Sequence, residues 1–187
     1  MKTRFIKLKK YAAFSFVEVM LSVTILSIGI VGVMPLFISN LRVSMDSRDQ
    51  IIADMLAQEG TELVQSLRDN NLVNGAVGGI FDGATFPGSS SSNCRISYDT
   101  DKIICDGTYQ LNLDANKFYT HKADTGAVAT KFKRKISVAY SPNSDNTSAT
   151  KAEIISMTIW GNVFPDIGSC NAGNKCAYTK LILTKWN

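Results

Sequence analysis

The sequence predicts an α+β fold in which one long N-terminal helix carries a small antiparallel β-sheet. Two observations favour this fold: an apolar stretch near the N-terminus that continues as an amphipathic helical pattern, and a later part in which apolar and polar residues alternate. A chain of 187 residues, 45% of them hydrophobic, has room for one modest domain and an extended element. We expect a lollipop shape, with the apolar half of the helix protruding and the amphipathic half packed against the sheet.

The apolar half of the helix is the segment Phe14–Ile38, in which Glu18 is the only charged residue. Because a helix needs roughly 20 apolar residues to span a bilayer, we predict that this segment is transmembrane. The basic residues before it should stay in the cytoplasm by the positive-inside rule, which leaves the rest of the chain outside. The expected precursor is therefore a single-pass protein of the cytoplasmic (inner) membrane, N-terminus in and C-terminus out.

Two other kinds of segment share the basic start and the apolar run. A secretory signal peptide has an apolar region of roughly 7–15 residues followed by a small-x-small cleavage site. Here the apolar run is longer, and Pro35, Leu36 and Phe37 occupy the place where such a site would lie. A plain signal anchor remains the alternative.

The net charge of +4 depends on the first ten residues, which hold five of the 20 Lys and Arg residues. If this leader is removed, 15 basic and 16 acidic residues remain, for a net charge of −1. Phosphate binding needs a sustained cluster of Lys and Arg. The composition therefore does not support a nucleic-acid-binding protein.

Glu18 distinguishes this apolar segment from an ordinary anchor. A carboxylate in hydrocarbon costs on the order of 2.5–3.5 kcal/mol, so it needs a partner or a function unless it lies among the lipid headgroups. The residues around it form a precursor signature: Lys9-Lys10-Tyr11-Ala12-Ala13, followed by Phe14-Ser15-Phe16-Val17-Glu18. This signature resembles the prepilin leader of type IV pilins and of the pseudopilins of type II secretion.

The resemblance implies a cleavage site and a modification. A prepilin peptidase would cut between Ala13 and Phe14 and methylate the new amine of Phe14. Glu18 would become the fifth mature residue, as in the family, and would set the register of assembly by pairing with the Phe14 amine of a neighbouring subunit. The family usually has glycine before the cut, where this chain has Ala13, the smallest replacement.

The function implied is that of a structural subunit, a major or minor pilin, of a type IV pilus, which ends as an extracellular filament. Its partners would be other pilin subunits, the prepilin peptidase, the inner-membrane assembly machinery and, before assembly, the membrane. The alternatives are a pseudopilin of a type II secretion system and a membrane-anchored binding protein that never polymerises. Gene neighbours would separate the first two.

Gly29, Gly32 and Pro35 cluster within the apolar run. Proline deletes a helical hydrogen bond and glycine costs about 1 kcal/mol relative to alanine, so the sequence predicts a weak point in the helix here. In type IV pilins a proline at this distance from the mature N-terminus marks a stretch that can unwind. Ordinary close packing of membrane helices at small residues is the other interpretation.

Beyond the membrane an amphipathic pattern extends the helix. The expected buried face is Leu41, Met45, Ile52, Leu56, Gly60, Leu63 and Leu67. Asp69, Asn70 and Asn71, followed by Gly75, predict the end of the helix. The domain division that we expect is a removed leader at 1–13, a long helix at 14–70 with its membrane part at 14–38, and an extracytoplasmic β-rich head at 71–187.

The head begins with a Gly- and Ser-rich segment, Val73–Ser92, which predicts a connecting loop. The expected strands contain Tyr109/Leu111/Leu113, Phe132/Ile136/Val138/Tyr140, Ile155/Met157/Ile159 and the run Tyr178–Trp186. A turn signal at Ser141–Asn146 separates two of them.

Cys94, Cys105, Cys170 and Cys176 all lie in the part expected outside the cytoplasm, where cysteines oxidise. Four cysteines allow three connectivities. We favour Cys94–Cys105 and Cys170–Cys176, because each closes a short loop. A zinc site is the competing interpretation, but neither spacing is a C-x-x-C pair and His121 lies far from both.

No catalytic pattern stands out, so we expect no enzyme, no cofactor and no metal. His121 is the only histidine and lies in a polar stretch, which predicts an exposed loop residue. Asn146-Thr147-Ser148 matches a glycosylation sequon to which we assign no role. Lys131, Lys133 and Lys135 should share one solvated face of a strand.

Overall fold

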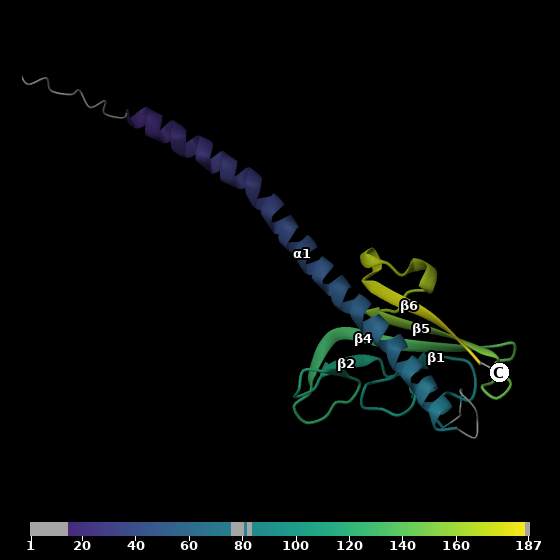
Figure 1. The fold of residues 1–187 in the computed structure, drawn as a ribbon. Helices are drawn as coiled ribbons and strands as arrows, with labels where there is room; N and C mark the ends of the chain where they lie inside the picture. Colours follow the sequence, from purple (N-terminus) through teal and green to yellow (C-terminus); the bar gives the residue numbers. More distant parts are fainter. Residues whose placement is uncertain (1–14, 76–80, 82–83, 186–187) are drawn as a thin grey trace, which may run out of the picture. The chain divides into compact units, whose positions relative to one another are not determined.

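The computed structural model describes residues 15–75, 81 and 84–185, and the chain falls into two compact units, one up to Met45 and one from Asp46. The element order is one α-helix, then six β-strands with two short 3-10 helices before the last strand (Figure 1). The leader 1–13 and Phe14 lie outside the described residues.

Helix α1 runs without a break from Phe16 to Val73. It ends because Gly75 adopts a φ of +57°, a left-handed conformation that glycine allows. The Gly75 N–H donates to the Leu72 carbonyl at 3.4 Å, as in a helix terminus. The predicted glycine stop is confirmed, although the helix continues a full turn beyond Asp69.

The strands form one antiparallel sheet in the order β3-β2-β4-β5-β6, and β1 pairs with β4 beside β2. Their bounds are Ser91–Cys94 for β1, Gln110–Leu113 for β2, Tyr119–Thr120 for β3, Val128–Ser141 for β4, Lys151–Ile159 for β5 and Cys176–Thr184 for β6. The short helices η1 and η2 are Ile167–Ser169 and Ala172–Asn174. A long helix packed on an antiparallel sheet confirms the predicted α+β class.

The central hairpin is formed by β4 and β5, which pair from Lys133↔Ile159 to Ser141↔Lys151. The predicted turn at Ser141–Asn146 lies in the connection between them. One boundary was wrong: Ser91 and Ser92 were expected in a loop but belong to β1, where Ser91 lies opposite Val138. Serine has no strong strand preference, and it is the pairing with β4 that makes this segment a strand.

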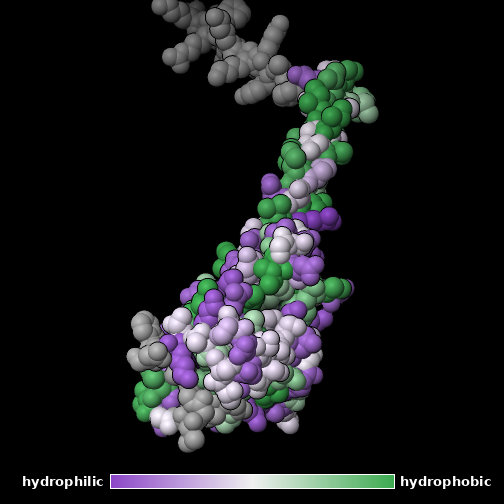
Figure 2. Space-filling model, turned by 90° about the vertical axis from the view of Figure 1, so that its right-hand side faces the viewer, coloured by the Kyte–Doolittle hydropathy of each residue, from purple (hydrophilic) through white to green (hydrophobic). Residues whose placement is uncertain are grey.

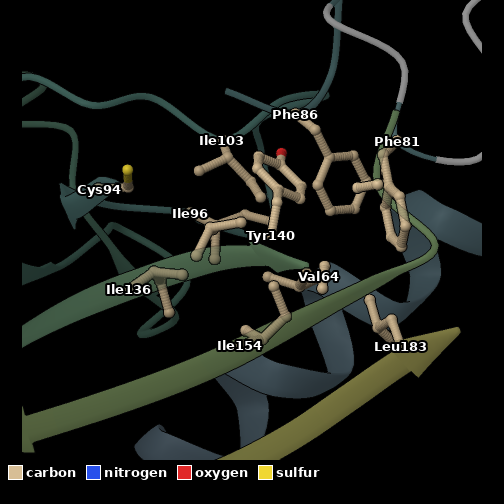
Figure 3. Packing of buried hydrophobic residues seen from close by; sticks show 13 residues of the cluster. Val64, Phe81, Phe86, Cys94, Ile96, Ile103, Ile136, Tyr140, Ile154 and Leu183 are labelled. Atoms are coloured by element: carbon tan, nitrogen blue, oxygen red, sulfur yellow. The ribbon is translucent and has the colours of Figure 1, made fainter. Parts of the chain in front are cut away.

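The main core lies between the outer part of α1 and the sheet. Figure 3 shows Val64 of α1 among Ile136 and Tyr140 of β4, Ile154 of β5 and two aromatic rings of the connecting segment. These rings, Phe81 and Phe86, lie edge to face with their centroids 5.5 Å apart. The connecting segment therefore contributes to the core rather than only linking helix and sheet.

The buried face of α1 differs in part from the predicted one. Leu56 and Gly60 are buried as expected, whereas Leu41 and Met45 are exposed. The predicted Ile52, Leu63 and Leu67 are partly buried against the core clusters. The other buried positions are Val64 of the main core and four small or polar residues, Ala53, Ala57, Thr61 and Asn71. A stripe of small residues marks the line where the helix approaches the sheet most closely.

Gly60 lies at the closest approach. A Cβ atom at this position would come within 2.3 Å of Ser156 Oγ and 3.1 Å of Ile136 Cδ1. The first distance is shorter than any real contact of two such atoms, so the Ser156 side chain or the helix itself would have to shift.

We expect Gly60→Ala to lower the free energy of unfolding by about 1–3 kcal/mol, because overpacking outweighs the better helix propensity of alanine. Thermal unfolding of the full chain in detergent, followed by circular dichroism, measures this. Gly88→Ala is the matched control, since a Cβ there meets nothing within 4 Å. Equal or higher stability of Gly60→Ala would contradict the close approach.

The predicted strand at Ile155, Met157 and Ile159 is present as β5, but its alternation did not show which face meets α1. Ile155, Met157 and Ile159 were expected to alternate with more polar neighbours, but the residues that face α1 are Ala152, Ile154, Ser156 and Thr158. Met157 and Ile159 are buried on the other face, with Cys176 and Phe164. Because both faces of β5 are covered, alternation alone does not tell which face meets the helix.

Candidate functional site

The N-terminal part of α1, from Phe16 to Met45, presents apolar side chains on all sides. All of its large hydrophobic residues are exposed, with Phe16 at 74% and Val31 at 73%. Figure 2 shows this helical segment coloured mainly as hydrophobic. Within the described part of the chain, α1 is the one helix that is long and apolar enough to span a membrane, with a mean hydropathy of 2.3 in its most apolar window.

The polar groups of this segment are satisfied inside the helix. The hydroxyls of Ser22, Thr24 and Ser27 each donate to the carbonyl four residues earlier, at 2.7–2.8 Å. Such bonds remove the cost of placing a hydroxyl in an apolar environment. The segment can therefore be surrounded by lipid or by other apolar helices.

Glu18 lies in the first turn of α1 and is exposed. Its N–H donates to the Ser15 carbonyl at 2.9 Å, which begins the helix. A carboxylate near a helix N-terminus interacts favourably with the helix dipole. Among the described residues no cation forms an ion pair with it.

Gly29, Gly32 and Pro35 lie within the continuous helix. A Cβ atom at either glycine would meet nothing within 4 Å. Together with Leu26, Val33 and their neighbours, Gly29 lines a shallow apolar groove along the helix. The contacts of the described residues therefore do not account for small residues at these positions.

The cleavage site lies outside the described residues. Neither Ala13 nor Phe14 is described, and the described helix begins two residues after Phe14, at Phe16. The described residues therefore do not test the predicted cleavage between Ala13 and Phe14.

The four cysteines form two disulfides, Cys94–Cys105 and Cys170–Cys176. This is the pairing that we favoured over the two other connectivities. Cys94 is fully buried in the main core and Cys176 in the cluster beneath the η1–η2 segment. Within the described residues, no group of three His, Cys, Asp or Glu side chains could hold a metal ion.

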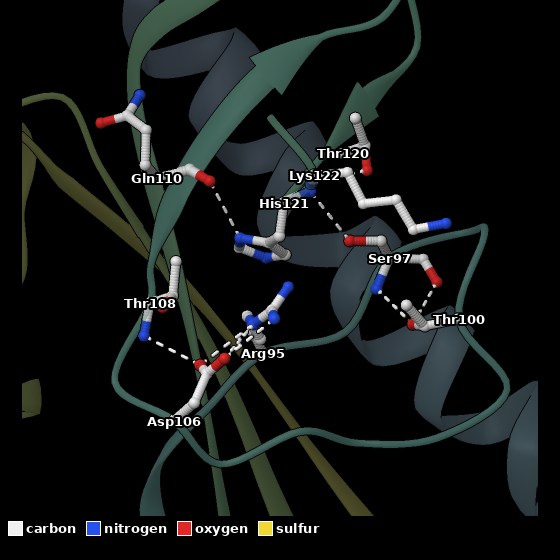
Figure 4. A network of polar contacts seen from close by, with 9 residues as sticks. All are labelled: Arg95, Ser97, Thr100, Asp106, Thr108, Gln110, Thr120, His121 and Lys122. Atoms are coloured by element: carbon white, nitrogen blue, oxygen red, sulfur yellow. Dashed lines mark hydrogen bonds and ion pairs between the residues drawn. The ribbon is translucent and has the colours of Figure 1, made fainter. Parts of the chain in front are cut away.

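The prediction for His121 was wrong, because its side chain is 5% exposed rather than in an open loop. Its Nδ1 lies 3.0 Å from the Gln110 carbonyl, which can only accept, so Nδ1 carries the proton (Figure 4). Nε2 is buried without a hydrogen-bond partner among the described residues. Burial lowers the pKa of His121 to about 4, and the nearby Arg134 guanidinium adds to the effect.

We expect His121 to make the head less stable in mild acid. The folded pKa lies below the ordinary value of 6.5, so the stabilisation is complete above pH 6.5 and is lost as the pH falls towards 4. The loss is on the order of 3 kcal/mol. Thermal unfolding of wild type and His121→Gln between pH 7.5 and 4.5 measures it, and the variant should lose less stability over that range. Parallel pH profiles would contradict the assignment.

The lysines of β4 lie on the face of the strand opposite the core residues. Lys131 is exposed and pairs with Asp49 of α1, while Lys133 and Lys135 are half-buried. Lys135 Nζ lies 4.8 Å from the centre of the Phe164 ring. These are ordinary contacts of a solvated sheet face.

Sequence reasoning missed Arg134, which is completely buried between β4 and α1. Its Nη1 donates to the Leu56 carbonyl at 3.0 Å and lies 3.2 Å from a Glu59 carboxylate oxygen. Its Nη2 donates to the Ile96 carbonyl at 2.8 Å. A signal was present, because Arg134 lies in phase with the apolar residues Phe132 and Ile136.

Comparison with known proteins bears on the N-terminal segment. Residues 8–34 match the family model described as the prokaryotic N-terminal methylation motif, which is typical of type IV pilins and pseudopilins. No curated protein matches the chain, and no solved structure matches it. The match includes the junction at Ala13, Glu18 and the first part of the exposed apolar helix, and the chain therefore carries an N-terminal methylation motif like that of type IV pilins and pseudopilins.

Proposed function

We propose that this protein is a structural subunit, a major or minor pilin, of a type IV pilus. The observation that carries the proposal is the exposed apolar part of α1 from Phe16 to Ile38, in which Glu18 is the only charge and which overlaps a methylation motif at residues 8–34. So much apolar surface is unstable in water and needs a partner. Lipid supplies that partner before assembly, and the helices of other subunits supply it afterwards.

Processing prepares the subunit for assembly. A prepilin peptidase removes the leader at 1–13 by cutting between Ala13 and Phe14, and methylates Phe14. Before the cut the chain is a single-pass protein of the inner membrane, with residues 14–38 in the bilayer and the head at 71–187 outside. The inner-membrane assembly machinery then moves the subunit into an extracellular filament.

Glu18 sets the axial register of the filament. After cleavage, the Phe14 amine and the Glu18 carboxylate are opposite charges in apolar surroundings, and each is costly unless it is paired. The position of Glu18 in the first turn of an exposed apolar helix supports this role, since the helix that neighbouring subunits would cover brings the carboxylate with it. Gly29 and Gly32 support close packing of helices, since both leave open space on the helix surface.

Mass spectrometry of the mature N-terminus tests the proposal. The expected result is a chain that begins at methylated Phe14 and is recovered in filaments sheared from the cell surface. A chain that keeps Met1 would overturn the proposal. A processed chain that stays with the cell, and whose loss blocks protein secretion, would identify a pseudopilin instead.

We expect Glu18→Ala to reduce incorporation into filaments by about tenfold or more, because the Phe14 amine is then buried without a counter-charge. Cleavage should continue, which separates an assembly defect from a processing defect. Immunoblots of sheared filaments against the membrane fraction measure it. Glu62→Ala, an exposed carboxylate farther along α1, is the control and should assemble normally. Normal incorporation of Glu18→Ala would refute the register role.

A further inference from the structure

A polar groove of about 360 Å³ lies beside the C-terminal turns of α1. One wall is formed by the helix and the segment just after it, including Asn70 and Asn74. The other wall is the segment after β1, including Tyr98, Thr100 and Asp101. Its volume falls at the lower end of the range for small-molecule pockets, roughly 300–1,000 Å³.

The helical wall presents a row of polar side chains that form no hydrogen bonds with other described residues. Ser66, Asn70 and Asn74 follow one another at intervals of four residues and therefore lie along one face of the helix. The Asn74 N–H donates to the Asn70 carbonyl at 2.9 Å, so the row continues past the last helical residue. All three side chains are exposed, and none forms a hydrogen bond with another described side chain or backbone group.

The opposite wall is held in place by hydrogen bonds within the segment after β1 and from His121 and Arg134. Thr100 Oγ1 accepts from the Ser97 N–H at 3.0 Å and donates to the Ser97 carbonyl at 2.9 Å. Ser97 Oγ accepts from the N–H of His121 at 3.0 Å, as Figure 4 shows. Arg134 Nη2 donates a hydrogen bond to the carbonyl of Ile96, the residue before Ser97. A wall fixed in this way loses little entropy when a ligand binds.

Tyr98 supplies an aromatic surface to the groove. Its ring is 48% exposed and packs against Phe118 with the ring centres 5.5 Å apart. Its hydroxyl donates to Asp114, which fixes the direction of the ring. Leu63 and Leu67 add apolar surface on the helix side.

We propose that this groove binds an uncharged saccharide. Amides donate and accept hydrogen bonds, and the Asp101 carboxylate accepts them, which suits the many hydroxyls of a sugar. The Tyr98 ring and the two leucines suit its C–H faces. None of the described residues that line the groove is Lys or Arg, and Asp101 repels anions, so sialylated or phosphorylated glycans do not fit. The groove lies wholly within the unit from Asp46, and this inference does not depend on filament assembly.

A glycan array tests the proposal with the full chain in lauryldimethylamine oxide, a detergent that carries no sugar. The probes are immobilised glycans ending in glucose, galactose or N-acetylglucosamine, together with sialylated counterparts. We expect binding to a subset of the neutral glycans and none to the sialylated ones. The same saccharide, added free in solution, should compete with the immobilised glycan for the protein, which shows that the sugar itself is bound.

Variants in and outside the groove then show whether the glycan binds there. Asn70→Ala and Asn74→Ala should each weaken binding by about tenfold, because each removes hydrogen bonds to the sugar. Both positions are exposed, so these variants keep the fold. Gln65→Ala, an exposed residue of α1 outside the groove, is the control and should bind like wild type. The proposal is overturned by no binding to neutral glycans, by a preference for sialylated glycans, or by binding that both asparagine variants retain.

Discussion

Replacing Arg134 with alanine is expected to lower the free energy of unfolding of the head by about 3–5 kcal/mol. The guanidinium is completely buried and joins α1, β4 and the segment after β1 through the Leu56 and Ile96 carbonyls and Glu59. Its removal leaves a cavity in the centre of the helix–sheet contact and deprives the Ile96 carbonyl of a donor. No other described side chain connects these three parts of the head by hydrogen bonds.

Two further variants separate the charge from the contacts. Lys133→Ala removes a cation from the residue that precedes Arg134 in β4 and lies on the opposite face of the strand. It should change the free energy of unfolding by less than about 0.5 kcal/mol. Arg134→Met fills most of the volume without the hydrogen bonds, so its loss should be smaller than that of Arg134→Ala. Chemical unfolding of the full chain in detergent measures all three. Equal stability of Arg134→Ala and Lys133→Ala would show that the buried contacts contribute nothing.

The sequence predicted the features that depend on local patterns. The continuous apolar run and the glycine after Val73 were sufficient to predict a long helix and its end. The short spacings of the cysteines favoured the two disulfides that the structure contains. These features need no knowledge of which elements meet, since neighbours in the chain determine them.

Features that depend on distant contacts were harder to predict. The face of β5 that meets α1 carries Ala152 and Ser156 because Gly60 brings the helix so close. The larger Met157 and Ile159 are buried on the other face by the segment that precedes β6. Hydrophobicity alone favours the larger residues for the face towards the helix, so the sequence pattern does not show which face of β5 meets α1.

Buried polar residues were missed for a related reason. His121 was expected to be exposed because it lies in a polar stretch, and nothing was expected of Arg134. Hydrogen bonds to carbonyls of other parts of the chain make the burial of both possible. His121 lies eleven residues from its Gln110 partner. A sequence pattern shows the polar group but not the carbonyl that satisfies it.

Replacing both cysteines of the Cys94–Cys105 disulfide with serine is expected to cost about 3 kcal/mol or more. The loop that it closes spans 11 residues and contains Ile96 and Ile103, both buried in the main core. Constraint of the unfolded chain alone accounts for about 3 kcal/mol for a loop of this size. Serine at position 94 adds a polar hydroxyl at a site with no exposed surface.

The Cys170–Cys176 disulfide is the matched comparison, since it closes a loop of 6 residues. Chain entropy alone predicts that losing it costs only about 0.5 kcal/mol less than losing Cys94–Cys105. We expect a larger difference, because residues 171–175 are exposed, whereas the longer loop holds core residues and a wall of the groove. Unfolding of both double serine variants under oxidising conditions measures the difference. If the two double variants differ in unfolding free energy by no more than the entropic value, Ile96 and Ile103 stay packed without the disulfide. Hydrogen bonds such as the one from Arg134 to the Ile96 carbonyl would then be sufficient to hold this segment.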